Sequence, residues 1–266
     1  MRSRYLSELT TPEIEQYLSA SPSTAILPVG SVEMHGPHMP TGTDTLIAAA
    51  VAVRLAESAN GLVLPAIQYT WAGATDGFAG TFSMPPELAR QTVEAVVLKA
   101  HRMGFGRQVL LSHHGGNRCV LELAVRRTYE MHHIPVAYIR VSTPTCPQAA
   151  EALSGLNASA AECSMMLGAL DVLGKGGLYR EQDLRYDDPG PPHPQSGRDV
   201  RAAGALVGQF NQDVRQHVAP SVRISREKGV AFIDAQVRGI AEVLDHLERY
   251  CGDVRGQANR GWWRGD

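Results

Sequence analysis

One stretch constrains the fold of this 266-residue chain more than any other: residues 27–44, LPVGSVEMHGPHMPTGTD. The apolar run 25–29 predicts a buried strand, because parallel strands covered on both faces read as continuous apolar runs rather than as an alternation. The loop after Gly30 then follows the carboxyl end of that strand, where open α/β sheets place their ligand sites. We therefore expect an α/β fold with a site at this edge of the sheet.

The loop itself carries four groups that bind metals, Glu33, His35, His38 and Asp44. Glu33 and His35 are two positions apart, so in an extended backbone they project to the same side. A single loop histidine or glutamate is more often solvated or hydrogen-bonded, but four such groups in a loop restrained by Gly and Pro favour a metal site. Asp44 has a second interpretation, because Asp is a favoured N-cap and a helical pattern follows it.

The rest of the chain alternates strand and helix patterns. Strands are predicted at 61–67, 108–111 and 135–141, and helices at 88–100, 118–132, 158–170 and 237–247. Such alternation is typical of a mostly parallel sheet, and the length suits a single domain over residues 1–266. The segment SHHGGN, 112–117, therefore follows a second strand at the same edge as the first loop. Glu162 stands in the first turns of the helix predicted at 158–170, among small and apolar residues.

Three segments lack such patterns. The loop 68–86 has neither periodicity and carries Trp71 and Phe78, so we expect it to wall a pocket. Residues 174–201 are rich in Gly, Pro and charge and predict a mobile flap or an intersubunit segment; His193 within it is expected to be solvated. Residues 252–266 are expected to form a terminal tail, packed on a neighbouring subunit or disordered.

Composition excludes several classes of partner. The net charge of -2 and the lack of a Lys/Arg run argue against a nucleic-acid partner. The four cysteines form no CxxC pair, which favours buried, reduced thiols over a structural zinc. Neither a leader-like apolar segment nor a run of eighteen apolar residues occurs, so we expect a soluble cytoplasmic protein with no membrane contact.

Three motifs together resemble those of the creatininase family of metal-dependent amidohydrolases. They are LPVGSVEMHGPHMPTGTD at 27–44, LLSHHGGN at 110–117 and AECSMML at 161–167, and REKGVAFID at 226–234 also resembles the family's C-terminal region. The resemblance implies a three-layer α/β/α fold with a mostly parallel central sheet, commonly assembled as a homohexamer. It also implies two divalent ions per subunit that hydrolyse a C–N bond, with a metal-bridging hydroxide as the nucleophile.

The resemblance also implies the ligands. Glu33, Asp44 and His114 would hold one ion, and His35 would hold the other with Asp44 as the bridge. Imidazole and carboxylate ligands suit zinc best, with manganese or iron as alternatives. In creatininase a Glu follows the second-motif His by two residues, whereas this chain has Gly116.

The missing carboxylate has one candidate. We expect Glu162, on the third motif, to replace it as a ligand and catalytic residue, although a glutamate near a helix start is also favoured by the helix dipole alone. Glu122, on the helix after His114, is expected to face solvent.

The substrate pocket departs from the family as well. Where many members have a His that assists proton transfer, this chain has Asn157, which cannot act as an acid at neutral pH. His113 is the nearest candidate donor; a loop histidine bonded to backbone is the alternative. The family's E-H-x-x-F-P-G-T is replaced at 74–81 by ATDGFAGT. We therefore expect a pocket formed by Trp71, Phe78, Gly115, Gly116 and Asn157, and a substrate other than creatinine.

Together with the resemblance, these observations predict a dinuclear hydrolase that acts on a non-peptide amide, cyclic amide or formamide-like bond of a small-molecule substrate. A creatininase-like peptidase, or a hydrolase of another carbonyl-containing ring, stays open. A metal-binding hexameric scaffold without catalysis is the alternative from a different class, favoured by Asn157 in place of the family histidine.

Overall fold

The computed structural model describes residues 1–20, 23–179, 195–203 and 224–258. Four parallel strands form its sheet in the order β2-β1-β3-β4. The strands are β1 (Thr24–Pro28), β2 (Leu62–Val63), β3 (Arg107–Ser112) and β4 (Ala137–Arg140). Every residue of β1 and β3 is buried, as their apolar runs predict for central strands. The predicted strand at 61–67 is shorter than expected, since only an isolated bridge from Ile67 to Val29 continues it.

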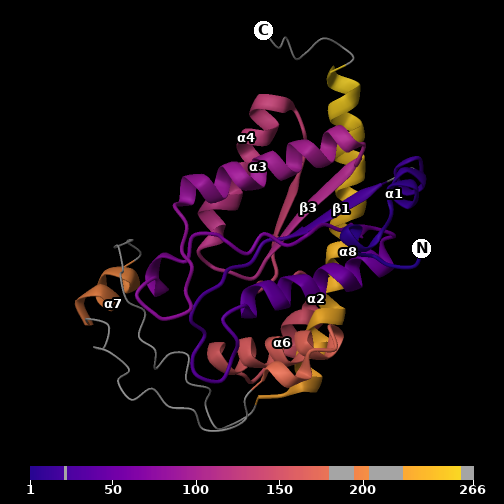
Figure 1. Ribbon diagram of the computed structural model, residues 1–266. Coiled ribbons are helices and arrows are strands. Elements are labelled where there is room, and N and C mark those ends of the chain that lie inside the picture. The colour runs from indigo at the N-terminus through magenta and orange to yellow at the C-terminus, as the bar shows by residue number, and fades with distance from the viewer. Residues whose placement is uncertain (21–22, 180–194, 204–223, 259–266) are drawn as a thin grey trace.

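Helices cover both faces of the sheet. The α-helices are α1 (Thr11–Leu18), α2 (Thr43–Ser58), α3 (Pro86–Met103), α4 (Asn117–His132), α5 (Pro147–Ala152), α6 (Ala158–Val172), α7 (Gln195–Ala202) and α8 (Arg226–Ala258). Single 3-10 turns lie at Leu6–Glu8, Gly73–Thr75 and Gly176–Leu178. Figure 1 shows β1 and β3 between α3 and α4 on one side and α2 and α6 on the other. The three-layer α/β/α prediction is confirmed.

The central strands divide the hydrophobic core into two layers. Along β1, Ile26 points into a core built from α2, α6 and α8, whereas Leu27 points into a core built from α3, α4 and Tyr17 of α1. On β3, Leu111 and Leu110 divide in the same way. This alternation follows from the strand period of two. It fixes β1 and β3 in the middle of the molecule and therefore fixes the loops that leave them.

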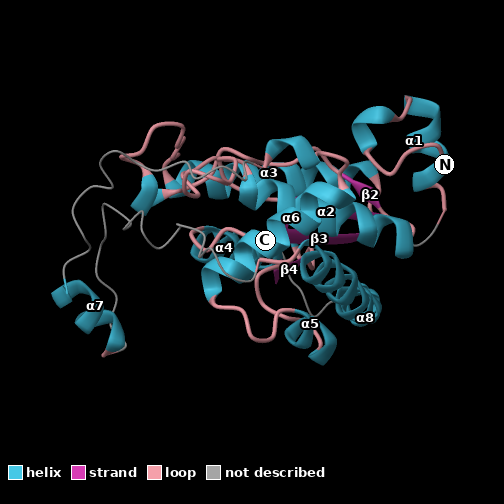
Figure 2. Cartoon of the chain, turned by 90° about the horizontal axis from the view of Figure 1, so that it is seen from below, coloured by secondary structure: helices cyan, strands magenta, loops and turns pink. Residues whose placement is uncertain are grey.

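Helices α6 and α8 cross at very short range. A Cβ atom on Gly229 would lie 1.8 Å from the carbonyl oxygen of Ser164, and one on Gly168 would lie 2.4 Å from the carbonyl carbon of Gly229. The two backbones can approach this closely because both residues at the crossing, Gly168 and Gly229, lack a side chain. Helix α5 also packs against α8 (Figure 2). The crossing holds α6, and with it Glu162, against the rest of the core.

The ends of several predicted segments differ from expectation. Helix α8 is much longer than the predicted 237–247 and reaches Ala258, so residues 252–258 are helical rather than part of a tail. Within 174–201, a 3-10 turn and part of α7 are described, while His193 lies outside the described residues. Cys163 and Cys251 are buried free thiols as predicted, but Cys119 is exposed.

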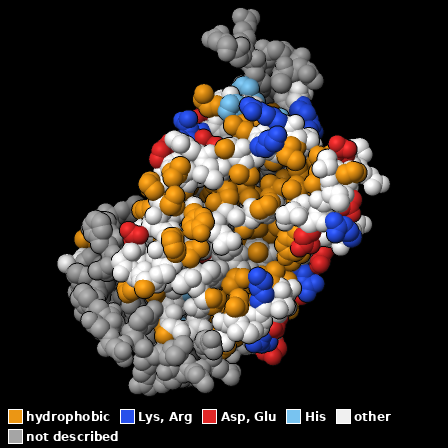
Figure 3. All heavy atoms as spheres, viewed as in Figure 1, with side chains coloured by type: hydrophobic (Ala, Val, Ile, Leu, Met, Phe, Trp, Pro, Cys, Tyr) orange, Lys and Arg blue, Asp and Glu red, His pale blue; other side chains and the backbone are white. Residues whose placement is uncertain are grey.

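Hydrophobic side chains gather on the face viewed in Figure 1, between α3 and α2 (Figure 3). A contiguous apolar face of this kind is typical of surfaces that are covered in assemblies. It is compatible with the expected homohexamer, which stays a prediction. Within the part of the chain that the structure describes, no helix is long and apolar enough to span a membrane.

Candidate metal centre

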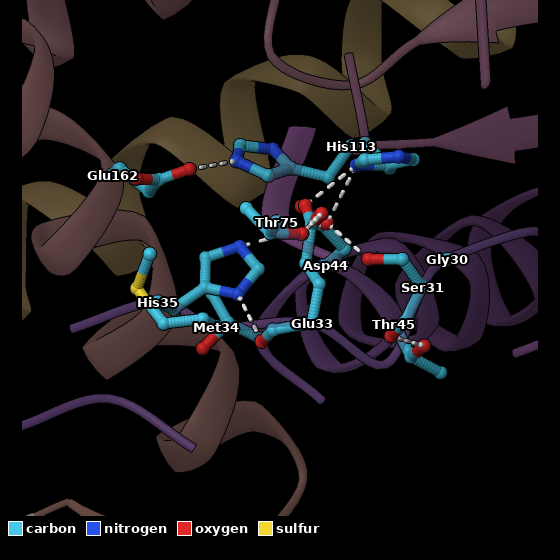
Figure 4. A network of polar contacts seen from close by, with 12 residues as sticks. Gly30, Ser31, Glu33, Met34, His35, Asp44, Thr45, Thr75, His113 and Glu162 are labelled. Atoms are coloured by element: carbon cyan, nitrogen blue, oxygen red, sulfur yellow. Dashed lines mark hydrogen bonds and ion pairs between the residues drawn. The ribbon is translucent and has the colours of Figure 1, made fainter. Parts of the chain in front are cut away.

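The ligand candidates meet at the carboxyl edge of the sheet, as the parallel topology requires. Glu33 and His35 lie in the loop after β1, and Asp44 is in the first turn of α2. His113 and His114 follow β3 directly, and Glu162 comes from α6 on the opposite side of the site. Figure 4 shows the side chains that it labels among these, Glu33, His35, Asp44, His113 and Glu162, pointing toward one another. Two loops separated by about seventy residues therefore share one site because β1 and β3 are neighbours in the sheet.

One group of potential ligand atoms consists of Glu33, Asp44 and His114, all of them buried. His114 Nδ1 lies 2.8 Å from Glu33 Oε1 and 3.0 Å from Asp44 Oδ2. Its other ring nitrogen, Nε2, donates to the carbonyl oxygen of Trp71 at 2.9 Å. A histidine that binds a metal through one nitrogen normally donates from the other to a carbonyl or carboxylate, so His114 has the geometry of a ligand.

A second group consists of His35, Asp44 and Glu162. His35 Nε2 lies 3.5 Å from Asp44 Oδ2, and its Nδ1 bonds to the carbonyl oxygen of Glu33 at 3.0 Å. The ligand atoms within each group lie within 4.8 Å of one another. Asp44 is the one residue that belongs to both groups.

Electrostatics favour ionised carboxylates and protonated imidazoles here. Burial alone would raise the pKa of Asp44, but the imidazoles of His35 and His114 outweigh it and hold that pKa well below its usual value. Burial would likewise lower the pKa of His35, yet Asp44, Glu162 and Glu33 raise it to about 9. Burial also acts to lower the pKa of His114, but its hydrogen bonds to the charged carboxylates of Asp44 and Glu33 raise that pKa well above its ordinary value. The ionised carboxylates are thus stabilised by positive charge beside them, which either protons on the imidazoles or metal ions can supply.

The residues present fit divalent ions. Buried carboxylates and imidazoles converge with ligand atoms only a few ångströms apart, and no thiol is among them. Oxygen and nitrogen donors without sulfur suit zinc, manganese and iron. His38 is buried but lies in neither group; its ring packs edge-on against Tyr179, with ring centroids 6.5 Å apart.

Asp44 does not cap α2. The N-cap is Gly42, and Asp44 is the second residue of the helix, after Thr43. Its carboxylate accepts a hydrogen bond from Ser31 Oγ at 2.5 Å. The backbone of the ligand loop packs closely against the start of α2 at Gly30, where a Cβ would lie 2.1 Å from Thr45 Oγ1. The N-cap interpretation of Asp44 is therefore wrong, and its side chain is committed to the site.

Gly116 stands where creatininase has a glutamate, and there is no room for one. A Cβ at Gly116 would lie 2.4 Å from His114 Nε2 and 2.8 Å from the Trp71 carbonyl oxygen. The hydrogen bond between these two groups occupies that space. By contrast, a Cβ on Gly115 would meet nothing within 4 Å. The structure instead brings Glu162 into the second group with His35 and Asp44, and its role as a ligand stays a prediction.

His113 contacts Glu162 rather than the first ligand group. Its Nε2 lies 3.4 Å from Glu162 Oε1, and its buried Nδ1 has no hydrogen-bond partner among the described residues. Burial alone would raise the pKa of Glu162, but His113 and His35 lower it. His113 therefore stands beside the second group, and its role as a proton donor stays a prediction. Glu122 pairs with Arg118 on the surface of α4, as expected of a solvent-facing glutamate.

The predicted pocket residues occupy several environments. Trp71 is 36% exposed, and Phe78 is half-buried in the same loop. Asn157 is the N-cap of α6, and its Oδ1 accepts a hydrogen bond from the Ala160 N–H at 2.9 Å. The pocket role of these residues stays a prediction, but the Asn157 side chain already has a structural task.

Sequence reasoning missed three polar residues beside the ligands. Thr75 Oγ1 donates to Glu33 Oε2 at 2.7 Å, and Ser31 donates to Asp44. Asn117 Nδ2 donates to the Gly30 carbonyl oxygen at 2.8 Å and so joins the two ligand loops. Ser31 and Asn117 belong to the motifs quoted above, which was the available signal. Thr75 lies in an irregular loop and gave none.

Comparison with known proteins agrees with this geometry. The family model described as "Creatininase: Creatinine amidohydrolase" matches residues 7–244. The chain belongs to the creatininase family. Its match therefore includes both ligand loops, α6 and most of α8.

Individual relatives differ in what their names state. The chain is 35% identical over 121 residues to creatinine amidohydrolase of Pseudomonas putida, which covers 44% of this chain and 46% of the relative. It is 37% identical over 134 residues to the mycofactocin precursor peptide peptidase of Mycobacterium ulcerans, covering 46% and 52%. The chain spans about half the length of these curated relatives. A solved structure of creatininase superposes with a TM-score of 0.68 at 27% identity, covering 92% of this chain and 98% of that one. Other solved creatininase forms are described as Mn and Zn-Zn types.

Proposed function

We propose that this protein is a hydrolase of C–N amide bonds that uses two divalent metal ions. The observation that carries the proposal is the pair of ligand groups, Glu33/Asp44/His114 and His35/Asp44/Glu162, which share Asp44. Two ions held in this way supply Lewis acidity that activates a water and polarises a carbonyl oxygen. The family relationship supports metal-dependent hydrolysis at C–N bonds.

The residues of the chain have separable tasks in this reaction. Glu33 and His114 would hold one ion and His35 and Glu162 the other, with Asp44 shared between the two groups. Ser31 donates a hydrogen bond that fixes the Asp44 carboxylate. In hydrolysis an oxygen of water bonds to the carbonyl carbon, the C–N bond breaks, and the nitrogen leaves with a proton. His113 is our candidate for delivering that proton, because it stands beside Glu162 while the Asn157 side chain is engaged at the start of α6.

For the substrate we propose a non-peptide amide, a cyclic amide or a formamide-like bond other than creatinine. The altered loop at 74–81 and Asn157 support this choice, since both lie where the family resemblance places substrate contacts. The relatives favour a second candidate, cleavage of a peptide amide, because several at 37% identity are named as precursor peptide peptidases. Quantifying released amine from cyclic amides, formamides and short peptides distinguishes these candidates.

The decisive experiment is metal content per subunit, measured by plasma mass spectrometry on wild type and on Glu162→Ala. We expect about two ions in the wild type and about one in the variant, because Glu162 is the only carboxylate of the second group besides the shared Asp44. Glu122→Ala is the matched control, since that glutamate is paired with Arg118 on the surface and should leave both ions in place.

One ion in both wild type and Glu162→Ala would refute the two-ion centre. The scaffold alternative or an enzyme with one ion would then replace it. Loss of metal in Glu122→Ala to the same extent would show that the effect is not specific to the site.

A further inference from the structure

The loop that precedes α3, residues 68–85, is bonded along its length to the ligand loop after β1. Thr70 Oγ1 donates to the Gly30 carbonyl oxygen at 2.7 Å, and the Phe82 N–H donates to the Val32 carbonyl oxygen at 2.9 Å. The Met34 N–H donates to Thr81 Oγ1 at 3.0 Å. The 68–85 loop, which was expected to line the pocket, therefore packs directly against the ligand loop and is hydrogen-bonded to it.

Two contacts of this 68–85 loop reach metal-ligand side chains. Thr75 Oγ1 donates to Glu33 Oε2, and the Trp71 carbonyl oxygen accepts from His114 Nε2. Thr75 is 1% exposed and Glu33 is 8% exposed, so water does not easily replace the Thr75–Glu33 bond. Figure 4 shows Thr75 beside the Asp44 and Glu33 carboxylates. A hydrogen bond of this kind fixes which carboxylate oxygen is left for the ion.

Both contacts belong to the same ligand group. Glu33 and His114 are the two residues of the first group that it does not share with the second. The contacts described for His35 and Glu162 come from other places, namely the Glu33 carbonyl oxygen and His113. The shared Asp44 takes its hydroxyl donor, Ser31, from the ligand loop. The 68–85 loop therefore supports one metal position far more than the other.

We infer that Thr75 is a positioning residue that orients Glu33, so that the 68–85 loop sets the metal affinity of the Glu33/Asp44/His114 position but not that of the His35/Asp44/Glu162 position. The inference rests on the proposed two-ion centre. It has a consequence for specificity, because a change in the loop that alters substrate choice also alters how one ion is held.

The test is a zinc titration of the metal-stripped full chain against a chromophoric chelator. Thr75→Val keeps the shape of the side chain and removes the hydroxyl, and Thr75→Ser keeps the hydroxyl. We expect Thr75→Val to weaken one of the two binding phases by about 10- to 100-fold while the other changes little. Thr75→Ser should recover most of the loss. Ser31→Ala, which removes the donor to the shared Asp44, should weaken both phases.

Three results would overturn the inference: unchanged phases in Thr75→Val, equal loss in both phases, or a Thr75→Ser protein as weak as Thr75→Val. Thermal unfolding of each metal-free variant confirms that it is folded. Should Thr75→Val not fold, Thr75→Ala is compared with Thr75→Ser in the same titration. A wild type that takes up one ion only would refute the two-ion centre; the ratio of Thr75→Val to Thr75→Ser affinity for that ion then decides whether Thr75 orients its ligand.

Discussion

The replacement Gly116→Ala tests the crowding around His114. The added Cβ would lie 2.4 Å from His114 Nε2, whereas ordinary contacts begin at 3.4 Å, so the ring must move by about 1 Å. Metal–ligand distances tolerate deviations of only about 0.2 Å. The Trp71 carbonyl oxygen would lie only 2.8 Å from the same Cβ. The backbone around residue 116 therefore cannot move away from His114 in that direction instead.

The expected loss of metal affinity follows from breaking the hydrogen bond between His114 Nε2 and the Trp71 carbonyl oxygen. Removing an outer partner of a metal ligand typically costs about 10- to 100-fold in affinity, which is about 1.4–2.7 kcal/mol. Overpacking a close site destabilises a fold by about 1–3 kcal/mol. We therefore expect Gly116→Ala to bind its first-group ion at least tenfold more weakly and to unfold at lower temperature without metal.

The neighbouring glycine supplies a matched control. Gly115→Ala adds the same methyl group one residue earlier, where it meets nothing within 4 Å. It should bind metal as wild type does, in the same chelator competition, and its stability should change by no more than about 0.5 kcal/mol. Equal metal affinity in the two variants would refute the argument that Gly116 is fixed by the His114–Trp71 contact.

Two further predictions concern protonation and the start of α6. Because the pKa of His35 is raised to about 9 and that of His114 is also raised, both imidazoles hold protons below those pKa values, and a metal ion must displace them. The logarithm of metal affinity should therefore rise by about one to two per pH unit between about pH 6 and 8, measured with a chelator of known pH dependence; a flat profile would contradict it. Asn157→Ala should lower the free energy of unfolding by about 1 kcal/mol through loss of the N-cap, and Asn157→Ser should restore it. Equal denaturation midpoints for these two variants would show that the cap contributes nothing.

The sequence by itself determined the fold class and most of the candidate ligands. The apolar runs of β1 and β3 are long enough to require burial on both faces, and the polar segments after them are short. Parallel strands then leave those segments at one edge whatever the details of packing. Glu33, His35, Asp44 and His114 could be chosen for this reason, and the family motifs assigned them to two ions.

Tertiary structure decided what depends on contacts between distant segments. Whether Glu162 reaches Asp44 depends on where α6 crosses the core, which the Gly168–Gly229 contact with α8 fixes. The place of Thr75 beside Glu33 depends on how an irregular loop folds back onto another, 42 residues away. The lack of room for a side chain at Gly116 likewise became visible only with the Trp71 carbonyl oxygen in place. Local periodicity carries information about neighbours along the chain, but these contacts arise from packing between segments that have no common period.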